Sequence, residues 1–137
     1  LLFGMPGTPA LYYGSEWGIS GEKAPCSDAG LRPALEKPEW NALTSWIARL
    51  AAARRGSPAL REGSYRNVLL TNLQLIFERR TETERVLVAV NADSQPYTAH
   101  FDAGCGLAWD LISGQQHDFG GGSQLPPYSA FFWKMER

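Results

Sequence analysis

The chain has 137 residues, of which 44% are hydrophobic and 12% aromatic, and its 13 basic and 14 acidic side chains give a net charge of −1. This composition supplies a packed core and excludes a disordered chain, and the near-neutral charge argues against nucleic acid or an anionic membrane surface as a partner. No apolar run reaches the roughly 18 residues of a membrane helix, so no membrane association is expected.

The first 37 residues are rich in glycine and proline. This pattern allows one short strand near residues 10–13 and otherwise predicts a long loop. Long loops without secondary structure usually serve a site. A functional site is therefore expected in this stretch.

A single amphipathic helix is predicted over residues 38–55. Pro38 suits the first helical position, and Gly56 suits the end. Arg49, Arg54 and Arg55 are expected on the exposed face. Apolar residues recur at spacings of three and four and form a stripe that we expect to be buried: Trp40, Leu43, Trp46, Ile47 and Leu50.

From Tyr65 onward the apolar period changes from about 3.6 to 2, which predicts strands. Five to eight short strands are expected, among them residues 97–101, 107–112 and 130–135, and those within LQLIFERR and RVLVAVN. Strands at this spacing favour a mainly β fold with an antiparallel Greek-key sandwich. We expect residues 64–137 to fold alone, with residues 130–135 as a core strand that places Phe132 and Trp133 on opposite faces.

The cysteines and other chemically active side chains predict no metal, cofactor or disulfide. Cys26 and Cys105 lie far apart and outside zinc-binding spacings. Free thiols are typical of a reducing compartment, so a cytoplasmic protein is expected. No phosphate-binding loop or catalytic trio is present. The remaining acidic and imidazole side chains are expected to be structural, with a solvated strand edge at Glu78, Glu82 and Glu84 and exposed or satisfied rings at His100 and His117.

The run G-T-P-A-L-Y-Y-G-S-E at residues 7–16 resembles the eighth-strand segment of the alpha-amylase family, glycoside hydrolase family thirteen, whose pattern is G-x-P-x-x-Y-Y-G-x-E. Every fixed position matches. The later order also resembles the family: a Gly-rich loop with an Asp and an Arg, a helix ending in L-x-x-x-R-R-x-x-P-A-L, and a sandwich with A-V-N and P-Y-S-A. The closing tail and V-L-L-T-N-L-Q-L-I-F-E-R most resemble the neopullulanase and cyclomaltodextrinase branch, which is often intracellular.

The resemblance implies a division of the chain into two parts. Residues 1–57 would be the end of a (β/α)8 barrel, with strand eight, the substrate-side loop and the last helix. Residues 58–137 would be the C-terminal β-sandwich domain. The parent enzyme would hydrolyse α-1,4-linked glucans with retention. The family's nucleophile, acid/base and third aspartate would precede Leu1, so the resemblance implies no catalytic residue in this chain, which alone is expected to be inactive.

Three side chains of the first part are candidates for substrate binding. Asp28 and Arg32 keep the D-x-x-x-R spacing with which family members hold a glucose unit, and a loop salt bridge without a ligand is the alternative. Glu16 would lie at the pocket rim, because barrel sites lie at the C-terminal ends of the strands. It would be a structural carboxylate or a direct substrate contact. Tyr12 and Tyr13 are expected to pack on opposite faces of the strand.

Two other functions remain open. One is a free-standing carbohydrate-binding or interaction module without catalysis, in which Trp109, Tyr128 or Trp133 would stack on a sugar. Exposure of these rings distinguishes the two cases, because a binding platform must be exposed. The other is a purely structural remnant of a truncated gene. Without the barrel, the helix stripe and residues 1–13 are expected to pack against the sandwich or against another copy of the chain, and the second arrangement is self-association.

Overall fold

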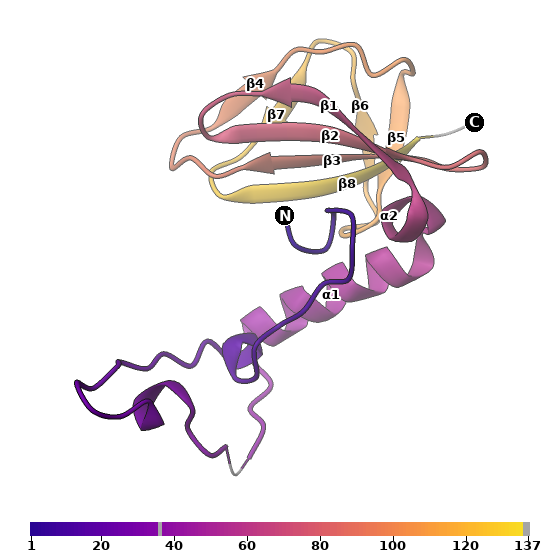
Figure 1. Ribbon diagram of the computed structural model, residues 1–137. Coiled ribbons are helices and arrows are strands. Elements are labelled where there is room, and N and C mark those ends of the chain that lie inside the picture. The colour runs from indigo at the N-terminus through magenta and orange to yellow at the C-terminus, as the bar shows by residue number, and fades with distance from the viewer. Residues whose placement is uncertain (36, 136–137) are drawn as a thin grey trace.

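The computed structural model describes residues 1–35 and 37–135. A β-sandwich forms one end of the molecule, and a long helix runs from it to an irregular loop at the other end (Figure 1). Within the described residues, no helix has the length and apolar character that a membrane crossing requires. The mainly β, antiparallel fold predicted from the sequence is confirmed.

Six strands form one antiparallel sheet in the order β1-β2-β3-β8-β5-β6, and β4 and β7 pair as a second sheet. The first three strands are joined in sequence, but β8 lies between β3 and β5, so the main sheet is held together by a non-sequential strand. The strands of the described chain are β1 (Ser64–Leu70), β2 (Gln74–Arg80), β3 (Arg85–Asn91), β4 (Tyr97–Ala99), β5 (Leu107–Asp110), β6 (Gln116–Asp118), β7 (Ser123–Leu125) and β8 (Ser129–Met135).

Strand β8 supplies a large aromatic side chain to each of the two cores. Phe132 pairs in register with Val88, and Trp133 pairs with Leu87. Because neighbouring residues of a strand point to opposite faces, Trp133 enters the core between the two sheets and Phe132 enters the core on the helix side. Their exposed fractions are 1% and 2%, so the prediction of a core strand here is confirmed.

Helix α1 (Ala42–Gly56) begins four residues later than predicted. The Asn41 side chain accepts a hydrogen bond from Thr44 N at 3.0 Å, and the Thr44 hydroxyl accepts one from Asn41 N at 3.4 Å. This reciprocal capping box fixes the first turn, so the expected start at Pro38 is wrong.

A second helix, α2 (Pro58–Glu62), follows immediately and was not predicted. The Ser57 side chain caps it, and Pro58 takes the first helical position, where its missing N–H costs nothing. Ala59 and Leu60 are fully buried against the sheet face that contains Phe77. Since α2 covers this face, independent folding of residues 64–137 stays a prediction, as does the domain division at residue 57.

Two arginines hold the start of the chain against the sandwich. Arg54 Nη1 donates to the carbonyls of Phe3 and Met5, both at 2.9 Å, and Arg54 Nη2 donates to the carbonyl of Gly7. Arg79 of β2 donates to the carbonyl of Gly4 at 2.7 Å. Burial lowers the pKa of both guanidiniums, and the charge of Arg54 lowers that of Arg79 further. The expected exposure of Arg54 is wrong: its exposed fraction is 7%, because residues 3–7 cover it.

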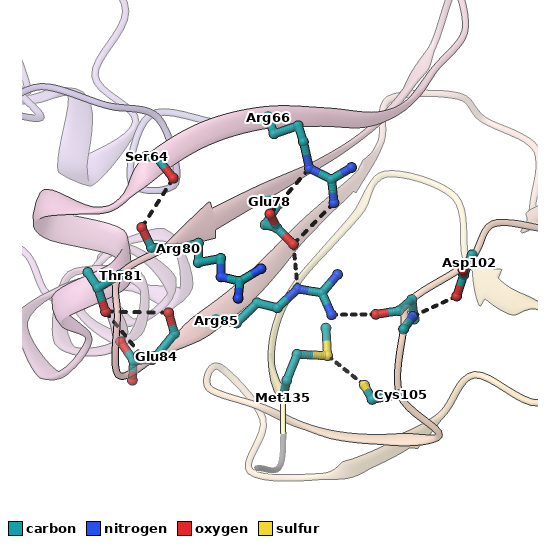
Figure 2. Close-up of polar contacts among 12 residues, drawn as sticks. Ser64, Arg66, Glu78, Arg80, Thr81, Glu84, Arg85, Asp102, Cys105 and Met135 are labelled. Carbon is teal, nitrogen blue, oxygen red and sulfur yellow. Dashed lines mark hydrogen bonds and ion pairs between the residues drawn. The ribbon is translucent and has the colours of Figure 1, made fainter.

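Two of the three glutamates expected at a solvated edge are buried. Glu78 accepts hydrogen bonds from Arg66 at 3.3 Å and from Arg85 (Figure 2). Glu84 accepts from Lys134 and from Ala59 N, each at 2.8 Å. Burial acts to raise the pKa of each carboxyl, but these hydrogen bonds outweigh it, so both pKa values are lowered. The third glutamate, at position 82, is exposed as predicted.

The strand expected at residues 10–13 and the burial expected for the helix stripe are both wrong in this structure. Residues 8–12 have no regular secondary structure, because no strand of the described chain pairs with them. Trp40, Leu43 and Trp46 are 74%, 42% and 50% exposed. Only Ile47 and Leu50 of the stripe are half-buried. The first part of the chain therefore presents an apolar surface.

The imidazole of His117 is packed into the core between the sheets. It stacks on Trp133 with ring centroids 4.2 Å apart, and Nε2 lies 2.9 Å from the Ser123 hydroxyl oxygen. Burial lowers its pKa, and the charges of Asp118 and Asp110 oppose that shift in part. The ring is satisfied as predicted, and His100 is exposed.

Phe132→Ala is expected to lower the free energy of unfolding by about 3 to 5 kcal/mol, because it leaves a cavity opposite Val88. Urea denaturation followed by circular dichroism measures the loss. Leu70→Ala on β1, where Leu70 is 67% exposed, is the control, and it should change stability by less than about 0.5 kcal/mol. Equal losses in the two variants would contradict the core assignment.

The lowered pKa of His117 predicts weaker folding in mild acid. As the pH falls through about 6.5, the unfolded imidazole binds a proton that the folded one resists, so the free energy of unfolding falls, by at most about 1.4 kcal/mol per pH unit. His117→Gln should flatten this slope between about pH 7 and pH 5. Denaturation curves across this range measure the slope. An unchanged slope in His117→Gln would rule out this source.

Candidate functional site

The loop over residues 14–33 lies at the end of the molecule away from the sandwich (Figure 1). It contains the short 3-10 helices η1 (Ser15–Trp17) and η2 (Ala29–Leu31). Gly14 and Gly18 flank η1 with φ of 85° and 74°, which glycine adopts without steric cost. The start of the loop is therefore built around two glycine turns.

The first turn of α1 anchors η1. The Thr44 hydroxyl donates to the Glu16 carbonyl at 2.7 Å, and the Asn41 amide donates to the Trp17 carbonyl at 2.9 Å. The same two side chains form the capping box of α1, so helix start and loop start are fixed together.

Glu16 is half-buried in η1. Its Oε2 is shielded from solvent and accepts no hydrogen bond within the described residues. A buried carboxylate oxygen without a donor is costly. The expected structural role, in which loop amides would satisfy the carboxylate, is therefore not met at this oxygen.

Asp28 and Arg32 are not joined by any hydrogen bond or ion pair in the described chain. Asp28 precedes η2, and its carbonyl accepts from Leu31 N at 2.9 Å. Its carboxylate lies 3.8 Å from Lys23 Nζ, and both side chains are more than half exposed. Such a surface ion pair contributes little stability, so Asp28 is weakly held.

Arg32 instead lines a hollow of about 400 Å³, together with Tyr12 and Tyr13. The two tyrosine rings are 4.8 Å apart and are 55% and 47% exposed, so the expectation that they pack on opposite faces is wrong. Strand alternation does not apply, because these residues form no strand. Neither Asp28 nor Glu16 is part of the hollow's lining. Sequence reasoning therefore missed the tyrosines, although adjacent aromatic rings before the Gly14 turn were a usable signal.

A guanidinium beside two aromatic rings can bind a sugar, because the rings offer apolar faces and the guanidinium offers several donors. Glycoside hydrolysis needs more, namely two carboxyl groups that flank the bond. The hollow's lining contains no carboxylate. The described residues also contain no group of three or more His, Cys, Asp or Glu side chains able to hold a metal ion. The hollow therefore presents groups that can bind a sugar.

Comparisons with known proteins agree on one family, although no protein-family model matches the chain. The alpha-amylase MalA of Haloarcula japonica is 32% identical over 127 residues, which are 83% of this chain and 17% of that protein. A cyclomaltodextrin glucanotransferase of Bacillus sp. strain 38-2 is 30% identical over 119 residues, 85% of this chain and 15% of that protein. The crystal structure of CldA, a cyclomaltodextrin glucanotransferase with a three-domain ABC distribution, matches with a TM-score of 0.82 and 25% identity, and covers 99% of this chain and 31% of that one.

The chain belongs to the alpha-amylase family, glycoside hydrolase family thirteen. It corresponds to a C-terminal part of these proteins, and it spans less than a fifth of the length of the two sequence relatives. The mainly β fold agrees with the structural match. Placement in the neopullulanase and cyclomaltodextrinase branch stays a prediction.

Thr44→Val keeps the side-chain shape but removes the hydroxyl that links the helix cap to the Glu16 carbonyl. The loss is expected to cost about 1 kcal/mol and to speed amide hydrogen exchange at residues 14–18. Thr44→Ser, which keeps the hydroxyl, is the matched control and should exchange as the unmodified chain does. Equal exchange in all three proteins, followed by mass spectrometry, would show that this contact does not hold the loop.

Proposed function

We propose that this chain is the C-terminal part of an enzyme that cleaves α-1,4-linked glucans with retention of configuration. Residues 1–57 end the catalytic barrel, and the sandwich closes and stabilises it. The relatives named above, an alpha-amylase and a cyclomaltodextrin glucanotransferase, support this substrate class. The catalytic carboxylates belong to other parts of the parent enzyme.

The observation that carries the proposal is the apolar surface on the first part of the chain. Exposed apolar surface that goes beyond scattered single residues marks an interaction site. The uncovered side chains on this part include large residues of the start, the loop and α1, namely Leu1, Leu2, Leu11, Tyr12, Tyr13, Ile19, Leu31, Trp40, Leu43 and Trp46. The remaining strands and helices of a barrel would cover such a surface.

The loop side chains fit a substrate-binding role in the parent. Arg32 already faces the hollow beside Tyr12 and Tyr13. Asp28 would give up its weak contact with Lys23. Its carboxylate would instead accept charge-assisted hydrogen bonds from sugar hydroxyls. The buried Oε2 of Glu16 would accept from a donor of the barrel or the substrate.

Two further properties belong to the proposal. Both cysteines are free, which suits a cytoplasmic enzyme. When the 137-residue chain is prepared alone, its uncovered apolar surface would drive self-association, which light scattering measures.

The proposal is tested by sequencing the coding region upstream of Leu1, expressing the whole reading frame and assaying maltodextrin cleavage. The whole protein should release sugars that are initially the α-anomer, detected by NMR, whereas the 137-residue chain alone should be inactive. In the whole protein, the double substitution Asp28→Ala and Arg32→Ala should raise KM several-fold. Turnover by the repurified 137-residue chain, or a reading frame without a barrel, would refute the proposal.

A further inference from the structure

The Oε2 atom of Glu16 is a buried acceptor that has no donor within the described residues. The backbone at Glu16 is held in place, because the Thr44 hydroxyl donates to the Glu16 carbonyl at 2.7 Å. Most buried polar atoms of folded proteins have a hydrogen-bond partner, so an orphaned carboxylate oxygen on a fixed backbone needs an explanation. The identity of the missing donor is therefore a question that the site itself raises.

Three cations from the first part of the chain are not this donor. Lys23 lies 3.8 Å from the carboxylate of Asp28. Arg54 donates to main-chain carbonyls of residues 3–7. Arg32 lines the hollow, of which Glu16 is not a part. Each of these side chains has another partner or another position, so none of them satisfies the Glu16 carboxylate.

The sugar-binding groups also lie apart from this carboxylate. Ser15 lines the hollow, but Glu16, the next residue along the chain, does not. Apolar side chains surround the start of the loop: a Cβ atom at Gly14 would lie 3.4 Å from both Ile19 and Leu35. Because the hollow does not reach the carboxylate, a sugar bound there is poorly placed to donate to Oε2.

The proposed barrel would bury Glu16 more deeply. Asn41 and Thr44 hold η1 against the first turn of α1, and Leu43 and Trp46 are exposed on the same helix. A barrel that covers this surface would remove the solvent that remains around the Glu16 side chain. A buried ionised carboxylate needs an opposite charge as well as hydrogen bonds. The donor is therefore expected to be an arginine or a lysine.

We propose that Glu16 links the loop over residues 14–33 to the preceding part of the barrel, through an ion pair with an arginine or lysine side chain of that part. This inference rests on the proposed function and selects the barrel, rather than the substrate, as the donor. Glu16 is then a positioning residue. Its ion pair fixes η1, from which the chain continues to Arg32 at the hollow, and its carboxylate does not contact the sugar.

The test compares Glu16→Gln in the 137-residue chain and in the whole reading frame, by amide hydrogen exchange at residues 14–18 without substrate. In the 137-residue chain the substitution removes an unpaired buried charge, so exchange should be unchanged or slower. In the whole protein it breaks an ion pair, so exchange should be faster by about tenfold or more. Asp28→Asn is the matched control: its ion pair is exposed, so exchange at these residues should change little in either protein.

Maltodextrin kinetics of the whole protein supply a second measurement. Glu16→Gln should raise KM several-fold and leave kcat nearly unchanged, because the loop is misplaced while the catalytic groups are not. An unchanged kcat also shows that the variant is folded.

Unchanged exchange of Glu16→Gln in the whole protein overturns the inference, and a raised KM alongside it would identify the sugar as the donor. Faster exchange in the 137-residue chain also overturns it, since the partner would then lie within this chain. Both results leave the proposed function standing, because cleavage of maltodextrin by the unmodified whole protein decides that proposal separately.

Discussion

The arrangement of the first part of the chain against the sandwich depends on hydrogen bonds that Arg54 and Arg79 donate to main-chain carbonyls. The guanidiniums come from different elements, α1 and β2, and they bind the same short segment, residues 3–7. Carbonyl dipoles rather than carboxylates compensate the two buried charges here. A charged donor gains more from such a hydrogen bond than a neutral one does, and loses more when left unpaired. The helix, the segment and the sheet are thereby tied into one unit.

The same unit explains the position of the loop over residues 14–33. The segment that the arginines hold leads through residues 8–13 into η1, and η1 is held again by Asn41 and Thr44 at the start of α1. The chain before the loop is held by Arg54, near the end of α1, and by Arg79 of the sandwich. The start of the loop is held at the start of α1. The placement of the loop therefore depends on contacts with the sandwich as well as on its own turns. The exposed tyrosines and Arg32 are presented on a supported frame. Contacts made by the sandwich therefore act on the placement of a loop at the other end of the molecule (Figure 1).

Those features of the fold that depend on local sequence pattern could be predicted from the sequence. The alternating apolar residues of β2 and the continuous apolar run of β3 predicted strands, and the placement of Phe132 and Trp133 followed from the alternation of side chains along a strand. The features that could not be predicted depend on contacts between residues that are distant in the sequence. Arg54 looked exposed on the helix until residues 3–7, about fifty positions earlier, were seen to cover it. Asp28 and Arg32 keep the D-x-x-x-R spacing, but spacing in a loop does not fix which way each side chain turns.

The insertion of β8 between β3 and β5 has a consequence for synthesis of the protein. Strand β3 is continuous in apolar residues, and its pairing partner Phe132 for Val88 emerges from the ribosome about forty residues later. Until then one edge of β3 has unpaired backbone groups and is a template for wrong pairing with another nascent chain. Non-local pairing of this kind is also slow. Solubility during expression should therefore depend on how quickly β8 closes that edge, and a chaperone that binds extended apolar strands would act at this step.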